Sequence, residues 1–130
     1  NNFYALNSSR YGLADAPVFV CFRNGTLIQT TRGDVPVEEL SVGDMVITRD
    51  HGPQPLRWIG SRALCSKTLK INPAMRPIRI AAGALGKDLP RRDLLVSPQH
   101  RILIRHGGQE YLITARHLLR AGMPGLSVRR

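Results

Sequence analysis

Apolar residues in this chain recur in short runs with polar neighbours, and few stretches follow a helical period. Alternation over four to eight residues is typical of a half-buried β-strand. Glycine, proline and aspartate separate these runs and favour tight turns, for example at Gly43-Asp44 and at Gly107-Gly108. The pattern predicts an all-β fold with strands at 17–20, 26–30, 45–48, 56–60, 77–80, 94–96, 101–105 and 111–114.

The segments between these runs are expected to be mainly loop. Residues 1–20 form a polar, irregular leader that becomes apolar only at its end. Residues 49–55 contain two prolines and predict a hairpin-like loop, whereas 61–76 predict a loop with one short helix. A second short helix is expected at 115–120. The strand at 77–80 is expected to be edge-like, because its apolar and polar residues alternate.

The length and the charge place further limits on the protein. A chain of 130 residues is expected to form one domain around a single core. Residues 1–56 carry four basic and six acidic side chains, whereas 57–130 carry fifteen basic and three acidic ones. Such asymmetry fits either a surface that binds a polyanion or a piece of a longer protein whose acidic part lies elsewhere, and we favour the second interpretation. The first residue is Asn rather than Met, which is typical of a fragment or a processed product.

Several classes of function are disfavoured. No stretch reaches the roughly 18 apolar residues of a membrane span, and the start lacks the basic and apolar regions of a signal peptide. Neither Cys21 nor Cys65 has a second Cys or His at ligand spacing, so we expect no metal site and no disulfide framework. The sequence is compatible with a single disulfide between the two cysteines, so it does not decide between an oxidising and a reducing compartment.

Cys21 stands where a thiol can react with its own backbone. It follows the apolar Val20 and precedes the turn signal Gly25-Thr26. Attack of the thiol on the Val20 carbonyl closes a five-membered ring and exchanges the peptide bond for a thioester. The reaction needs an activated thiolate, a proton donor for the departing nitrogen and hydrogen-bond donors for the oxyanion. Taken alone, a single cysteine is more often a small buried hydrophobe.

A second candidate segment is Ser97-Pro98-Gln99-His100, at the end of a buried run. A hydroxyl three residues before a histidine fits either a turn hydrogen bond or a catalytic pair. Histidine is suited to proton donation near neutral pH. His51, His106 and His117 have no comparable context and are interpreted as structural or exposed.

The spaced motifs are more specific together than any of them is alone. They are C-F-x-x-G-T-x-I-x-T (21–30), V-P-V-E-E-L-x-x-G-D-x-V-x-T-x-D (35–50), G-P-Q-P-L-R-W-I-G (52–60), P-I-R-I-x-A-G-A-L-G (77–86), L-P-x-R-D-L-x-V-S-P-Q-H-R-I-L (89–103) and A-R-H-L (115–118). From Cys21 to about Leu119 the chain resembles the Hint (hedgehog/intein) domain. It is most similar to the bacterial Hint subgroup that is found beside calcium-binding repeats in secreted proteins.

The resemblance implies a horseshoe of short twisted strands over 21–130, preceded by an upstream, N-extein-like segment at 1–20. Cys21 matches the nucleophile of the family's N-to-S acyl shift. His100 matches the histidine of the T-x-x-H motif, which protonates the scissile amide nitrogen, and Ser97 stands where the family usually has threonine. The implied function is autoproteolysis at Val20-Cys21, a single-turnover reaction of the chain on itself without a cofactor.

The chain departs from the family pattern at its C-terminal end. Splicing inteins end in His-Asn followed by Cys, Ser or Thr, whereas the last asparagine here is Asn72. The strands that close the family's horseshoe and the sterol-recognition extension of hedgehog proteins are not found either. We therefore expect cleavage without splicing from a C-terminally incomplete domain, which is slow alone or needs a missing C-terminal segment or a second chain.

Two other functions are compatible with the sequence. One is a basic β module that binds a polyanion while Cys21 is inert, and the other is an inactive Hint remnant with a structural role. The expected partner is the chain's own N-terminal flanking segment, with no membrane and with nucleic acid disfavoured. Cys65 is expected to be a bystander thiol, and secretion as part of a larger bacterial protein is the expected context.

Overall fold

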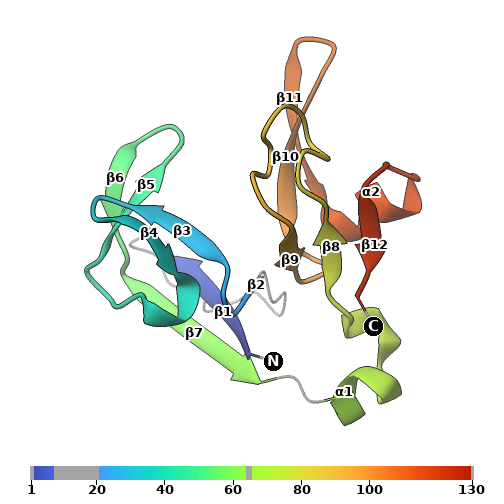
Figure 1. Cartoon of the computed structure of the whole chain (residues 1–130), viewed down its shortest axis with the longest axis horizontal. Coiled ribbons are helices and arrows are strands. Elements are labelled where there is room, and N and C mark those ends of the chain that lie inside the picture. Colours follow the sequence, from blue (N-terminus) through green and yellow to red (C-terminus); the bar gives the residue numbers. More distant parts are fainter. Residues whose placement is uncertain (1, 8–20, 64–65, 130) are drawn as a thin grey trace. The chain divides into compact units, whose positions relative to one another are not determined.

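The structure of the chain, a computed structural model, describes residues 2–7, 21–63 and 66–129 (Figure 1). The described residues belong to two compact units, one formed by 2–7 with 21–63 and the other by 66–129. In both units antiparallel strands predominate and the helices are short. The all-β class is therefore confirmed, but buried side chains occur in each of two units where a single core was expected.

The first unit contains two groups of paired strands (Figure 1). In one group, β1 (Asn2–Asn7) pairs antiparallel with both β2 (Phe22–Arg23) and β7 (Trp58–Ala63). The other group is an antiparallel sheet in the order β4-β3-β5-β6. Its strands are β3 (Leu27–Thr30), β4 (Gly33–Pro36), β5 (Met45–Thr48) and β6 (Gly52–Pro55).

A 3-10 turn contributes one residue to the core of the first unit. This turn, η1 (Val37–Glu39), follows β4 directly and starts after Pro36. Val37 is fully buried, and the core cluster consists of Val35, Val37, Leu40 and Leu56. Partly buried side chains pack against this cluster from several strands, namely Tyr4, Phe22, Ile28, Val46 and Ile59. Full burial of an apolar side chain stabilises a fold by about 1.5–3 kcal/mol, and partial burial contributes less. Apolar packing thus joins β1 and β2 to this cluster.

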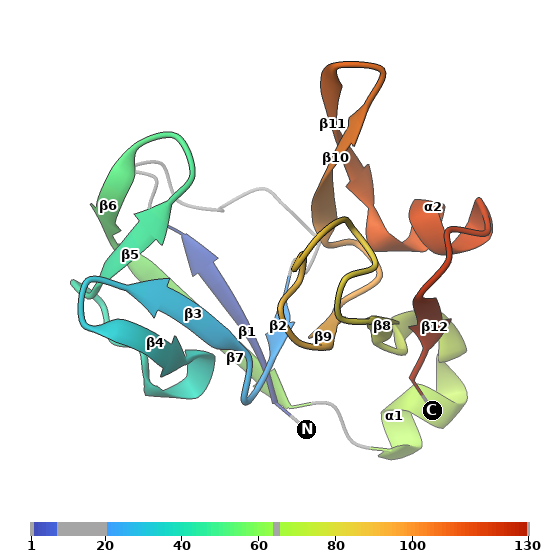
Figure 2. The same ribbon diagram turned by 45° about the horizontal axis from the view of Figure 1, so that its top comes forward.

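In the second unit, β8 (Ile78–Ile80) pairs antiparallel with both β9 (Leu94–Val96) and β12 (Leu126–Val128) (Figure 2). The hairpin of β10 (Arg101–His106) and β11 (Gln109–Thr114) turns at Gly107-Gly108. Both glycines have positive φ, 58° and 78°, as a type I′ hairpin turn requires. The helical elements are α1 (Ser66–Ile71), η2 (Pro73–Met75) and α2 (Ala115–Arg120).

Three expectations about the strands were wrong. Residues 1–20 were expected to be irregular, but they contain β1, which pairs with a strand on each side. Its first and last residues are both asparagine. The expected loop at 49–55 contains β6, which tolerates two prolines because it is the last strand of its sheet. β8 is not an edge strand, since the Arg-rich tail supplies β12 on its other side.

Other predictions agree closely with the structure. The predicted elements at 45–48, 94–96 and 115–120 coincide with β5, β9 and α2. The strand expected at 17–20 and the bystander residue Cys65 lie outside the described residues. No helix within the described ranges is long and apolar enough to cross a membrane.

Candidate functional site

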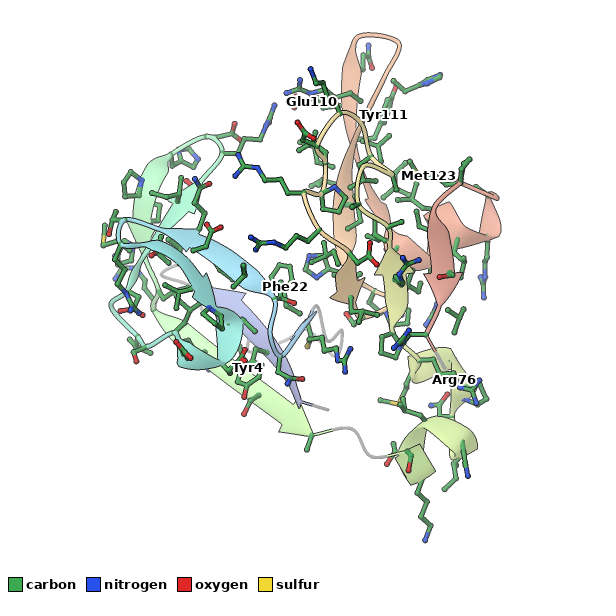
Figure 3. The ribbon with its side chains drawn as sticks, viewed as in Figure 1. Tyr4, Phe22, Arg76, Glu110, Tyr111 and Met123 are labelled. Atoms are coloured by element: carbon green, nitrogen blue, oxygen red, sulfur yellow. The ribbon has the colours of Figure 1, made fainter. Side chains whose placement is uncertain are left out.

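Cys21 lies immediately before β2 in the first unit, and its side chain is buried, with 5% exposed. The next residue, Phe22, packs on the core cluster and faces Tyr4 across the β1–β2 pair (Figure 3). Val20, on the other side of the predicted scissile bond, lies outside the described residues.

A tight turn follows β2 at Arg23–Thr26. The Arg23 carbonyl accepts two hydrogen bonds, from the Thr26 backbone N–H at 3.2 Å and from the Thr26 hydroxyl at 2.7 Å. Gly25 has φ +85°, whereas Asn24 is not among the residues with positive φ. This combination defines a type II turn, which favours glycine at its third position. The G-T pair of the first motif is thus explained by backbone geometry.

The same turn is tied to η1. The Val37 backbone N–H donates to the Thr26 carbonyl at 2.8 Å. The Gly25 backbone N–H donates to Oε2 of Glu38 at 2.7 Å. The segment after Cys21 is therefore attached to the core at Phe22 and to η1 at Gly25 and Thr26.

Gly43-Asp44 lies in the turn before β5, as the motif indicated. Gly43 has φ +95°, and the Asp44 backbone N–H donates to the Ser41 carbonyl at 3.0 Å. The Asp44 carboxylate accepts from the Ser41 backbone N–H at 2.9 Å and from the Arg32 guanidinium at 3.0 Å. The Ser41 hydrogen bond, followed by that of Arg32, lowers the pKa of Asp44 below its usual value.

Because the pKa of Asp44 is lowered in the folded state, the stability of the first unit should depend on pH. A carboxyl group whose pKa is lower in the folded state stabilises the fold above its unfolded pKa, of about 3.9, and loses that contribution as the pH falls through its folded pKa. We expect the first unit to lose stability below about pH 4, and Asp44→Asn to reduce that loss. Thermal unfolding followed by the fluorescence of Trp58, the chain's one tryptophan, measures it in this unit. Equal acid sensitivity of the parent and of Asp44→Asn would contradict the assignment.

In the second unit, Ser97 and His100 lie in the turn that joins β9 to β10. The His100 backbone N–H donates to the Ser97 carbonyl at 3.0 Å, so the structure brings these two residues together. Pro98 between them is buried, and the side chains of Ser97 and His100 are half-buried. The turn follows Val96, which is fully buried in β9.

The N-terminus of α2 holds this turn from the other side. The Ala115 N–H donates to the His100 carbonyl at 2.8 Å, and the Arg116 N–H donates to the Pro98 carbonyl at 3.0 Å. The first N–H groups of a helix have no partner within the helix, and here the turn supplies two acceptors for them. Thr114 caps the helix, because its hydroxyl accepts from the His117 backbone N–H at 3.2 Å. His100 therefore lies in a turn with defined backbone bonds on both sides.

The other three histidines are exposed, as the sequence indicated. His106 ends β10 beside the hairpin turn. His117 lies in the first turn of α2, where its ring Nδ1 is 3.1 Å from the Thr114 hydroxyl. The His51 backbone N–H donates to the Thr48 hydroxyl at 3.1 Å. Among the described residues, no group of three or more His, Cys, Asp or Glu side chains could hold a metal ion.

Two hydrogen bonds of its carboxylate account for the place of Asp93 in the fifth motif. Its carboxylate accepts from the Arg79 guanidinium at 2.8 Å and from the Ala82 backbone N–H at 2.9 Å. The Ala82 hydrogen bond, and then that of Arg79, lowers the pKa of Asp93. Since Arg79 lies in β8 and Asp93 directly precedes β9, the ion pair supports the register of these strands.

Cys21 belongs to the first unit, and Ser97 and His100 belong to the second. That these three residues act at one site stays a prediction. Sequence reasoning missed the contacts that fix their segments, namely those of Glu38 with Gly25 and of the α2 N-terminus with the 97–100 turn. The only signals for them were the glutamates of V-P-V-E-E-L and the threonine before the second helix.

The fold and the two candidate segments define an all-β domain with a cysteine before a short strand and a histidine in a fixed turn. A family model described as the Hint domain matches residues 20–127. The chain therefore belongs to the Hint domain family. No curated protein and no solved structure matches the chain.

Proposed function

We propose that this chain cleaves itself at the Val20-Cys21 bond through an N-to-S acyl shift. The observation that supports this most directly is the position of Cys21. It stands at the second residue of the family match, which begins at residue 20. Its side chain is buried at the head of β2, in a segment that is attached to the core of the first unit.

The chemistry of the proposed reaction is balanced within the chain. The Sγ thiolate of Cys21 attacks the carbonyl carbon of Val20 and forms a tetrahedral oxyanion. The carbon–nitrogen bond then breaks, and the nitrogen of Cys21 takes up a proton and becomes a free amine. The Val20 acyl group is left as a thioester on Sγ, which water or an external nucleophile can attack, releasing the N-terminal segment.

We assign the proton donor for the departing nitrogen to His100 and the polarisation or orientation of the scissile peptide to Ser97. Two features of the second unit support these assignments. The turn has backbone hydrogen bonds to α2 on one side and adjoins the buried end of β9 on the other. A donor that is held by such bonds loses little freedom when it reacts.

The biological setting is a further part of the proposal. The residues of the spaced motifs favour the bacterial Hint subgroup and a place within a larger secreted protein. The substrate is then the chain's own N-terminal flanking segment, and no cofactor takes part.

The test is chemical cleavage of the purified chain followed by mass spectrometry. Dithiothreitol attacks a thioester and hydroxylamine traps it as a hydroxamate, so each should yield two fragments split between residues 20 and 21. With hydroxylamine, the smaller fragment should carry a hydroxamic acid at Val20. An intact mass of both this chain and a version extended at its C-terminus, or cleavage at another bond, would contradict the proposal.

The polyanion-binding alternative predicts different behaviour. It expects steep salt dependence of binding to a polyanion such as heparin. It also expects no difference between the parent and a variant without Cys21.

A further inference from the structure

We infer that Glu38 is a positioning residue for Cys21, acting through the turn that follows β2. The inference rests on the proposed function, because it concerns the nucleophile of that reaction. Glu38 lies in η1, in the first unit with Cys21, and its carboxylate accepts the Gly25 backbone N–H at 2.7 Å.

The hydrogen bond acts on the one peptide that decides the turn type. Type I and type II turns have similar end residues and differ mainly by a flip of the central peptide, which here joins Asn24 to Gly25. The N–H of that peptide is the group that Glu38 holds. Gly25 has φ +85°, the value of a type II turn. Glu38 thus favours the orientation of the central peptide that the structure shows.

Only a very short backbone segment separates this peptide from Cys21, so the orientation of the peptide affects the position of Cys21. β2 contains two residues, and Cys21 is only four residues before Gly25. Phe22 is attached to the core, and the turn is attached to η1, so both attachments define the course of the backbone between them. A displacement of about 1 Å at a reacting group can cost roughly a hundredfold in rate.

The chain offers a matched control at the neighbouring position. Glu38 and Glu39 are adjacent, both are exposed and both belong to η1. The hydrogen bonds and ion pairs of the described residues include the Glu38 carboxylate but not that of Glu39. Removing either carboxylate changes the net charge equally, so only loss of the Gly25 hydrogen bond separates the two variants.

The test compares cleavage rates with dithiothreitol in the full chain carrying Cys65→Ser. Glu38→Ala should slow cleavage about ten- to a hundredfold, and Glu39→Ala should cleave at the parent rate. Glu38→Gln should stay within a few-fold of the parent, because its amide oxygen still reaches the Gly25 N–H. Glu38→Asp keeps the charge but is one methylene shorter, so it should be slowed like Glu38→Ala.

A second measurement is alkylation of Cys21 by iodoacetamide in the folded variants. Because this thiol is buried in the parent, Glu38→Ala and Glu38→Asp should raise its alkylation rate several-fold. Glu38→Gln and Glu39→Ala should leave the rate unchanged. Thermal unfolding shows which variants are folded, and if Glu38→Ala is not, the Asp and Gln variants decide.

The outcomes separate this inference from the proposed function. If neither the parent nor a version extended at its C-terminus cleaves, the proposed function fails, and the alkylation rates alone decide the inference. Equal alkylation in all variants, equal cleavage in parent and Glu38→Ala, or an equal loss in Glu38→Ala and Glu39→Ala would each overturn it. Slow Glu38→Gln with fast Glu38→Asp would also overturn it, since charge rather than reach would then control the rate.

Discussion

Cys21→Ala is expected to abolish thiol-induced cleavage at Val20-Cys21. The variant lacks the sulfur that would carry the acyl group, so no thioester can form at this position. The fold should persist, because a single small side chain is truncated and Phe22 still attaches β2 to the core. A typical point substitution costs about 1 kcal/mol in the free energy of unfolding.

Mass spectrometry after incubation with dithiothreitol measures the loss, and thermal unfolding checks that the variant is folded. Cys65→Ser is the matched control, since it removes the chain's other thiol and should leave cleavage unchanged. Equal cleavage in the parent and in Cys21→Ala would overturn the assignment of the nucleophile. Loss of cleavage in Cys65→Ser would contradict the bystander role of Cys65.

The strands that sequence reasoning found are those whose signal is local. Met45–Thr48 and Leu94–Val96 are β-rich runs next to turn signals, and their bounds coincide with β5 and β9. β1 and β12 have weaker local signals and exist because distant strands pair with them. β8 was assigned to an edge for the same reason, since its partner Leu126–Val128 lies more than forty residues further along the chain. Pairing over such separations cannot be read from a local pattern.

The candidate residues were found by motif, but the contacts that hold them were not. Cys21, Ser97 and His100 have reactive or polar groups at spacings that a motif records. The contribution of Glu38 depends on a backbone N–H thirteen residues away, and that of α2 depends on its first N–H groups. Hydrogen bonds between backbone and side chains of different segments follow from tertiary structure. A sequence pattern indicates the residue type at such positions but not its partner.

His100→Ala is expected to slow cleavage by about 10²–10⁴, the usual cost of removing a general acid. The acyl shift releases a backbone amine, which is a poor leaving group until its nitrogen is protonated. Loss of the imidazole leaves only water for that task. The backbone bonds of His100 with Ser97 and Ala115 do not involve its ring, so the turn should persist in the variant.

His106→Ala and His117→Ala are the controls. His106 is exposed at the end of β10, and His117 keeps its backbone bond to Thr114 when its ring is removed. Both variants should cleave at the parent rate, and if all three variants cleave alike, His100 is a structural residue. The dependence of rate on pH separates the roles further. A histidine that donates the proton must carry it, so the parent rate should fall at the pH where the imidazolium deprotonates. That fall should be absent from His100→Ala and retained in both controls, whereas a merely structural effect would lower the rate equally at every pH.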